Sequence, residues 1–345
     1  MKALAASLRK LEPRWPFLAL LYGGLVMVHV IDLHMYLRRS PDFRRWHSWH
    51  DLIIHGAGPY PDQYRPLSYW LAELVYRIWL NVPWAGAKTT YELGTTFEYS
   101  HLLVRFLFLT ASLFLFHLYL RKWFASPACA AAVIFTAAVL PLTVMRCSIC
   151  VTDPLNLLVF VVGYWLIRDG KGAWLPLLVF IGMINRETAG MLFFAYVFVS
   201  VGKPAREWLP TAASVLVAAA AAYFGIRAYY GPRVNWESTS PAHYFASNFL
   251  DWRTWELILL LVGAWAFWAF VGLRSKPVFL RRCLLMLLLL FAGHASSGYI
   301  REVRYWLPAL PVLLPLAMWS VWGPDRQGIG DGGLRGADSA LVPRA

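Results

Sequence analysis

The chain has 345 residues, of which 59% are hydrophobic and 15% are charged, and its mean hydropathy is +0.50. This composition is too apolar for an ordinary soluble globular protein and indicates an integral membrane protein. The formal net charge of +13 does not indicate nucleic-acid binding, because the basic residues are scattered between apolar runs and form no continuous stripe. Each charge of a membrane protein must lie in a loop, at an interface or in a water-filled cavity, so the charges predict the topology.

The first 15 residues carry Lys2, Arg9, Lys10 and Arg14 and no cleavage site, which is typical of a cytoplasmic N-terminus leading into a signal anchor. Ten apolar runs predict an all-α polytopic protein of about ten transmembrane helices, at residues 16–37, 102–120, 127–145, 154–167, 173–184, 189–202, 209–226, 257–273, 283–293 and 306–322. Several runs are shorter than the roughly 20 residues that cross a bilayer. We expect their polar ends to lie inside the protein or in a cavity.

The first outer loop, residues 38–100, is predicted to contain amphipathic interfacial helices. Ser40, Pro41 and Asp42 form a helix-start pattern, and Gly56 would end that helix. In the segment 66–80 the apolar residues follow helical spacing, and Glu73 and Arg77 form an i,i+4 pair on the other side. We therefore expect a helix in the interface here rather than a membrane span.

The charges support this topology only in part. With ten spans and the N-terminus inside, the basic connections 121–122, 168–171, 203–206 and 274–282 lie in the cytoplasm, as the positive-inside rule requires. Many arginines nevertheless fall outside: Arg38, Arg39, Arg44, Arg45, Arg65, Arg146, Arg186, Arg227, Arg233, Arg253, Arg301 and Arg304. This excess against the rule calls for a functional explanation.

Two acids stand at predicted helix starts on the outer side. Asp42 would lie in the positive field of a helix N-terminus beside Arg44 and Arg45, which favours its carboxylate form. Such a carboxylate can accept a proton from a substrate hydroxyl or orient that hydroxyl, and it can equally be a helix cap. Asp153 begins the run 154–167 and has the same two interpretations.

Two further polar corners fall on the same side. Asn185, Arg186, Glu187 and Thr188 separate two short apolar runs. Arg301 and Arg304 are three residues apart, so on a helical turn they could hold one anion. Structural ion pairs of Glu187 or Glu302 with an arginine are the alternative interpretation.

Other motifs give weaker signals. His47, His50, Asp51 and His55 are spaced like part of a metal site, but the remaining histidines form no matching cluster. No nucleotide-binding motif is present in the sequence. We therefore expect no resident cofactor and name no metal-binding residues. A bound divalent metal is the alternative expectation. Cys147 and Cys150 are compatible with a disulfide or with small residues at a helix end.

These residues resemble a known family. Asp42-Phe43, Trp46, Leu52-Ile53, Gly56, Pro59-Tyr60 and Tyr64-Arg65-Pro66-Leu67 are similar to the first outer loop of GT-C glycosyltransferases, particularly the family 87 type. Asp153, the segment 185–188, and Arg301 to Pro308 resemble further GT-C features in the expected order. The resemblance covers about residues 16–322. It departs from the family in lacking an Asp-Asp or Glu-Asp pair, which leaves metal dependence open, and in having Trp46 where Tyr is common.

The resemblance implies a transferase that takes a sugar from a polyprenyl-phosphate carrier and transfers it, with inversion, to an acceptor hydroxyl. By analogy Asp42 is the catalytic base, and Asp153 is a second catalytic acid that orders a substrate. Arg186, Arg301 and Arg304 are the candidates for the carrier phosphate, since arginines suit a leaving phosphate. We expect Tyr60, Arg65, Glu187 and His50 to contact substrate.

The expected organisation is a single GT-C-like transmembrane domain, residues 1–322, and a flexible tail, residues 323–345, whose Leu341 to Arg344 resemble a protease-site tag remnant. The expected location is a bacterial inner membrane, with the site facing the periplasm or exterior. The expected partners are the lipid-linked donor, membrane lipids, and a lipid, glycan or protein acceptor.

A lipid-linked-sugar flippase or transporter is the alternative function, although the chain shows no internal repeat of the kind transporters carry. A non-catalytic scaffold protein is a third interpretation of the sequence.

Overall fold

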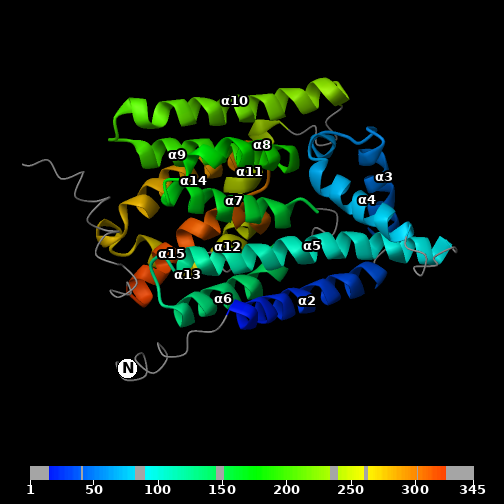
Figure 1. Ribbon diagram of the computed structural model, residues 1–345, viewed down its shortest axis with the longest axis horizontal. Helices are drawn as coiled ribbons and strands as arrows, with labels where there is room; N and C mark the ends of the chain where they lie inside the picture. The colour runs from blue at the N-terminus through cyan, green and yellow to red at the C-terminus, as the bar shows by residue number, and fades with distance from the viewer. Residues whose placement is uncertain are drawn as a thin grey trace, which may run out of the picture.

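The computed structural model describes residues 15–39, 42–81, 90–144, 151–233, 240–259, 263–300 and 302–323, and every regular element in these ranges is helical. The side chains of some helix residues, Asp42 and Arg304 among them, lie outside this description, as does Arg301 entirely. The helices lie side by side along the long axis of the molecule, and α3 and α4 cover one end (Figure 1).

Four helices are long and apolar enough to cross a membrane, namely residues Trp15–Tyr36, Thr96–Leu120, Ala205–Tyr230 and Val278–Ser297. They belong to α2 (Trp15–Arg39), α5 (Thr90–Leu120), α10 (Ala205–Tyr230) and α14 (Val278–Ser297). Shorter helices pack between them: α6 (Ser126–Val144), α7 (Asp153–Arg168), α8 (Leu175–Asn185), α9 (Met191–Ser200), α11 (Pro241–Phe249), α12 (Trp252–Ile258), α13 (Ala264–Phe270) and α15 (Leu310–Val321). The fold is therefore all-α, as predicted, and fits a membrane protein, whereas ten spans are not confirmed.

Hydrogen bonds between helix ends show how the chain alternates in direction. Lys122, just after α5, donates to Asp169, just after α7, at 2.8 Å. Arg282, early in α14, donates to the carbonyl of Val199 at the end of α9 at 2.9 Å. α5, α7 and α9 thus end, and α14 begins, at the same end of the bundle (Figure 1). We call this end, with Lys122, Arg168, Lys276 and Arg282, the basic end.

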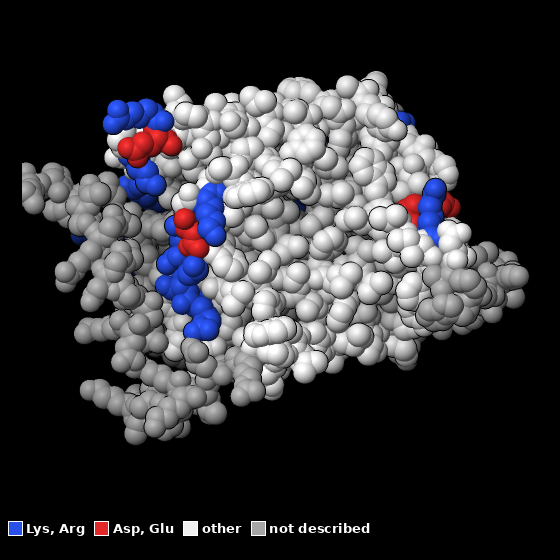
Figure 2. Space-filling view, in the orientation of Figure 1, with Lys and Arg blue, Asp and Glu red and all other residues white. Residues whose placement is uncertain are grey.

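On one face of the molecule (Figure 2), the described charged side chains are concentrated at the two ends. On the face shown in Figure 2, most described charged side chains gather at the basic end and a smaller group lies at the opposite end. The described surface between them is almost free of charge. Large apolar side chains such as Leu20, Val28, Val217 and Phe224 are exposed on α2 and α10. A nearly uncharged middle zone with exposed apolar side chains is what a bilayer requires of the protein surface that it contacts.

The first loop forms the cap at the other end. α3 (Asp42–Ile54) is described from the residue after the predicted first helical position, Pro41, which lies outside the described residues, and Gly56 follows the helix with a φ of 72° in the left-handed region. A short 3-10 turn, η1 (Asp62–Tyr64), leads to α4 (Leu67–Leu80), in which Glu73 accepts from Arg77 at 2.7 Å. Trp70, Leu74 and Ile78 form an exposed apolar stripe on α4. Both expected amphipathic helices are therefore present.

Several expected boundaries differ from the observed ones. The run expected at 283–293 is part of the longer α14, because Arg281 and Arg282 are helical and interrupt only the apolar pattern. Within the run 257–273 the structure describes the last residues of α12 and all of α13, while residues 260–262 between them lie outside the described ranges. The run 306–322 begins as a 3-10 segment, η6 (Val303–Ala309), before α15. Apolar composition locates segments that suit a membrane or a protein core but does not show where hydrogen bonding ends a helix.

Candidate functional site

Two motifs that are about 120 residues apart in the sequence meet at the end opposite to the basic end. Arg65, just before α4, donates from Nε to Oε2 of Glu187 at 2.7 Å, and its Nη1 lies 3.9 Å from Asp62. Ser68 donates to Oδ1 of Asn185 at 2.6 Å. Burial opposes the charge of Arg65, but the Glu187 and Asp62 carboxylates outweigh it and raise the pKa of Arg65 above its usual value. The segment 62–68 is thus joined to the polar corner 185–188 by side-chain contacts.

A second arginine shares the Glu187 carboxylate. Arg227, near the end of α10, lies 3.6 Å from Oε1 of Glu187. Its guanidinium carbon lies 3.5 Å from the ring centroid of Tyr223 and 4.4 Å from that of Tyr64. The hydroxyl of Tyr64 in turn donates to the Gly231 carbonyl at 2.8 Å. Glu187 therefore holds two guanidinium groups that come from different parts of the chain.

Asp153 and Arg186 form a deeper ion pair. Asp153 at the start of α7 is fully buried, Arg186 is 3% exposed, and Nη1 of Arg186 donates to Oδ1 of Asp153. Within the part of the chain that the structure describes, Oδ2 of Asp153 and Nε of Arg186 have no hydrogen-bond partner. A buried polar atom without a partner costs about 1–3 kcal/mol, so these two atoms need a group that the described residues do not supply.

Small residues explain why the pair can form. A Cβ on Gly182 of α8 would lie 2.7 Å from the Cβ of Ala189 and 2.8 Å from Val159, and one on Gly163 of α7 would lie 2.5 Å from Leu192. These glycines let α7, α8 and the start of α9 approach closely. The backbone of Arg186 is extended between α8 and the 3-10 turn η3 (Glu187–Gly190). Arg186 and Glu187 consequently leave the helix at a break, next to the first turn of α7.

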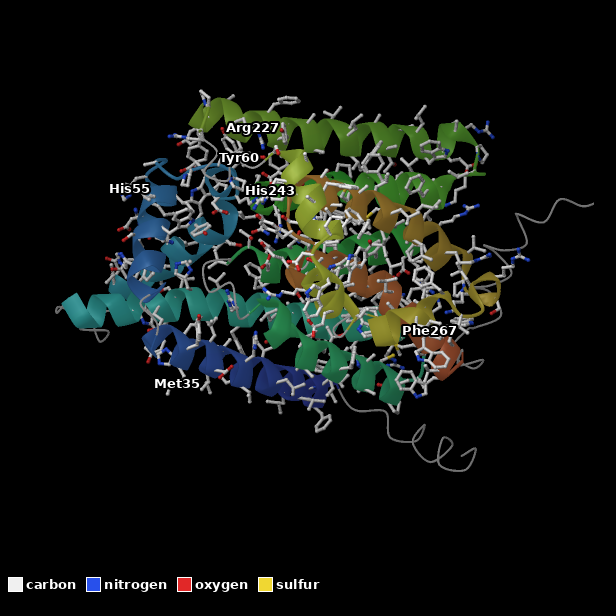
Figure 3. The ribbon with its side chains drawn as sticks, turned by 180° about the vertical axis from the view of Figure 1, so that it is seen from behind. Met35, His55, Tyr60, Arg227, His243 and Phe267 are labelled. Carbon is white, nitrogen blue, oxygen red and sulfur yellow. The ribbon has the colours of Figure 1, made fainter. Side chains whose placement is uncertain are left out.

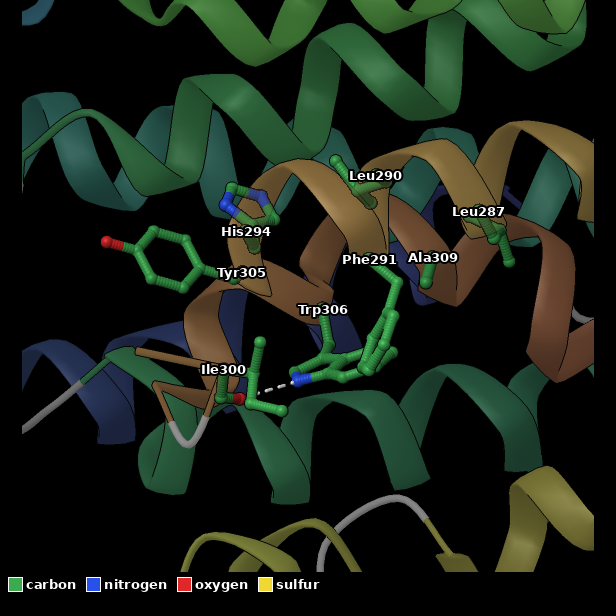
Figure 4. A pocket seen from close by; sticks show the side chains of 8 residues that line it. All are labelled: Leu287, Leu290, Phe291, His294, Ile300, Tyr305, Trp306 and Ala309. Carbon is green, nitrogen blue, oxygen red and sulfur yellow. Dashed lines mark hydrogen bonds between the residues drawn. The ribbon is translucent and has the colours of Figure 1, made fainter. Parts of the chain in front are cut away.

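An apolar pocket adjoins the pair. Its volume is about 270 Å³, including space open to the surroundings, and it is lined by Leu287, Leu290, Phe291, His294, Ile300, Tyr305, Trp306 and Ala309 (Figure 4). The Tyr305 ring stacks on His294 with ring centroids 4.3 Å apart. The same Tyr305 ring lies 5.1 Å from the guanidinium carbon of Arg186. Tyr305 therefore separates the apolar pocket from the Asp153–Arg186 pair.

A histidine chain ties the cap to the bundle. His50 on α3 is 1% exposed; its Nε2 lies 3.0 Å from Oε2 of Glu73, and its Nδ1 lies 3.1 Å from Nε2 of His101 on α5. Burial lowers the pKa of His50, and only part of this is offset by Glu73. Burial raises the pKa of Glu73, but its bonds to Arg77 and His50 lower it more. Both ring nitrogens of His50 are thus engaged by α4 and α5.

The structure brings five of the nine predicted site residues to this one end: Asp153, Arg186, Arg65, Glu187 and Tyr60. Tyr60 packs edge-to-face on Tyr64 with centroids 5.8 Å apart. Figure 3 shows Tyr60 and Arg227 at the same end as His55 and away from Phe267. His50 lies in the packing of α3, α4 and α5. The side chains of Asp42 and Arg304, and all of Arg301, lie outside the described residues, as do Cys147 and Cys150.

Two residues of this end were not singled out by the sequence. The sequence placed Arg227 among the many arginines predicted on the outer side. The pattern that could have singled it out is Tyr223, which lies four residues earlier on the same helix face. Tyr305 carries no local signal of its own. We call the group Arg65, Asp153, Arg186, Glu187 and Arg227 the arginine cluster and this end the site end.

The arginine cluster has the composition of a site for a polar or anionic group at the edge of an apolar bundle. Three of its five members are arginines, which can donate hydrogen bonds to phosphate or hydroxyl oxygens. Among the described residues, no group of three or more histidine, cysteine, aspartate or glutamate side chains could hold a metal ion.

Comparisons with protein-family models, curated proteins and solved structures found no match to this chain.

Proposed function

We propose that this protein is a membrane glycosyltransferase, in which a sugar carried on a polyprenyl phosphate is transferred to an acceptor hydroxyl at the site end. The observation that carries the proposal is the contact of Arg65 with Glu187, because it joins two of the motifs that resemble GT-C glycosyltransferases. The resemblance supplies the reaction, and the convergence of the motifs supports it.

In the proposed reaction the acceptor oxygen bonds to the anomeric carbon of the sugar. The bond from that carbon to the phosphate oxygen breaks, and its electron pair leaves with the polyprenyl phosphate. Asp42 takes the proton of the acceptor hydroxyl. Arginine side chains suit the negative charge of the departing phosphate without a nucleotide, and Arg301 and Arg304 are the candidates for this role.

The test is a transfer assay with the purified protein in lipid nanodiscs, supplied with a panel of polyprenyl-phosphate sugars and acceptors and read by product mass. We expect one donor to give a product heavier by one sugar. If no donor gives a product while lipid-linked sugar moves between the leaflets, the protein is a transporter and the proposal is wrong.

The residue-level test compares two acids of α3. Asp42→Asn should leave folding intact and remove most transfer, because the amide cannot take the proton. The matched control is Asp51→Asn, since Asp51 is exposed on the same helix and should keep wild-type turnover. Near wild-type transfer by Asp42→Asn would exclude Asp42 as the base.

A second pair of variants tests the phosphate role. Arg301→Gln and Arg304→Gln should raise the KM for the donor more than the KM for the acceptor. Equal effects on both constants would count against phosphate binding by these residues.

A further inference from the structure

We infer that the Asp153–Arg186 pair binds a hydroxyl group of a sugar or polyol, and is not itself a phosphate site. The inference rests on the proposed function in one respect: it takes this hydroxyl compound to be the acceptor of the transfer. It changes the role expected of Arg186 from a ligand of the carrier phosphate to a residue that holds Asp153 and donates from Nε to the hydroxyl.

The charge of Arg186 is already neutralised. Its Nη1 donates to Oδ1 of Asp153, and both side chains are buried. A phosphate placed against this pair would meet the Asp153 carboxylate as well as the guanidinium, and the repulsion would offset most of the attraction. Free guanidinium groups are better phosphate ligands than one held in a buried pair.

The two atoms left over define the ligand chemistry. Oδ2 of Asp153 can only accept a hydrogen bond while ionised, and Nε of Arg186 can only donate one. Each is buried, and neither has a partner among the described residues. A hydroxyl both donates and accepts, so one hydroxyl, or two neighbouring hydroxyls of a sugar ring, satisfies both atoms. A phosphate dianion offers no donor to Oδ2, and an ammonium group offers no acceptor to Nε.

The surroundings match a carbohydrate with an apolar substituent. Side-chain amides and hydroxyls lie around the pair: Asn185 donates to the carbonyl of Thr152 at 2.8 Å, and Thr188 donates to Asn156 at 3.3 Å. On the other side, the Tyr305 ring borders both Arg186 and the apolar pocket. An alkyl glycoside, with its sugar at the pair and its chain beside the Tyr305 ring, therefore serves as the probe.

The first experiment measures binding without any transfer reaction. The protein, in phosphatidylcholine nanodiscs, is heated with an alkyl glucoside or with the same compound permethylated on every hydroxyl, and unfolding is followed by tryptophan fluorescence. The wild type should be stabilised by the glucoside and not by the permethylated compound. Equal shifts with both compounds would overturn the inference and show binding through the alkyl chain only.

The variants are chosen so that they fold. Removing one charge of a buried pair is strongly destabilising, so the main variant is the double change Asp153→Asn with Arg186→Gln, which leaves no unpaired charge. In this variant the alkyl glucoside and its permethylated form should shift the melting temperature equally. The matched control, Asp169→Asn with Lys122→Gln, neutralises an ion pair at the basic end and should keep the difference.

The second experiment uses the transfer reaction. In the double variant the KM for the acceptor should rise at least tenfold, while the KM for the donor stays within twofold. Arg186→Lys, which keeps the charge, should recover part of the acceptor binding. A rise in the donor KM instead would return Arg186 to phosphate binding, and unchanged constants would make the pair purely structural.

The two experiments separate the two hypotheses. A hydroxyl-dependent shift without transfer by any donor would support the hydroxyl site and contradict the glycosyltransferase. Transfer without a hydroxyl-dependent shift would support the glycosyltransferase and contradict the hydroxyl site.

Discussion

The two ends of the bundle use their charged side chains in different ways. At the basic end, Lys276 and Arg282 donate to backbone carbonyls at helix C-termini, and Lys122 and Arg168 share Asp169. At the site end, Arg65, Arg227 and Arg186 pair with carboxylates from segments far away in the sequence. The basic end therefore completes helix ends, whereas the site end assembles side chains from separate motifs.

Burial should decide how much each charge contributes to stability. The Asp153–Arg186 pair and Lys276 are almost fully buried, while Glu187 and Asp169 are each about one fifth exposed, at 21% and 16%. A charge in contact with water is screened, and its loss costs little. The following predictions test this comparison.

The largest loss is expected at the site end. Arg186→Gln leaves the buried Asp153 carboxylate without its cation, which should lower the free energy of unfolding by about 3–5 kcal/mol. Thermal unfolding in nanodiscs measures the loss. Adding Asp153→Asn to this variant should recover a large part of the lost stability. If the double variant is no more stable than Arg186→Gln, the two side chains do not stabilise each other in the folded protein.

The next largest loss is expected at the basic end. Lys276 is 3% exposed, and its Nζ donates to the carbonyls of Trp268, Ala269 and Leu316 at 2.6–2.9 Å. Lys276→Met should lower the free energy of unfolding by about 2–3 kcal/mol, because these carbonyls lose a charged donor. The exposed Lys203 is the control, and Lys203→Met should leave stability unchanged. Equal melting temperatures for both variants would contradict the capping role.

A smaller loss of stability is expected when the carboxylates of Glu187 and Asp169, each about one fifth exposed, are removed. Glu187→Gln and Asp169→Asn each remove a carboxylate that holds two cations, so each should cost about 1 kcal/mol. Only Glu187→Gln should also impair sugar transfer, since it releases Arg65 and Arg227. Stability and transfer measured on the same preparations provide the check, and equal transfer by both variants would remove the functional distinction between the ends.

The smallest effect is a pH dependence in the cap. The pKa of folded His50 lies below its usual 6.5, so the unfolded chain binds a proton first as the pH falls, and the fold loses stability from about pH 6.5 downward. The folded pKa of Glu73 lies below its usual 4.5, so its contribution is present above that pH and is lost on further acidification.

His50→Gln should therefore flatten the upper part of this acid slope. Melting temperatures between pH 7 and pH 5 test the prediction, and His55→Gln, an exposed histidine near the same helix end, is the control. Identical slopes for wild type and His50→Gln would contradict the role of His50.

Parts of this molecule could be predicted from local chemistry. The Ser40-Pro41-Asp42 pattern located the start of α3 to within one residue, and helical spacing located α4 with its Glu73–Arg77 pair. These features depend on residues within a few positions of one another. The length of α14 could not be predicted in the same way, because Arg281 and Arg282 interrupt the apolar run but not the helix.

Composition and periodicity predict that the chain is apolar, helical and asymmetric in charge, because these properties depend on residues close together in the sequence. The pairing of the charges depends on how the helices pack. Arg65 pairs with Glu187, and Arg186 with Asp153, because the glycines of α7 and α8 allow close packing and the chain breaks its helix at Arg186. The partner of a charged side chain depends on distances between helices, which residue order alone does not specify.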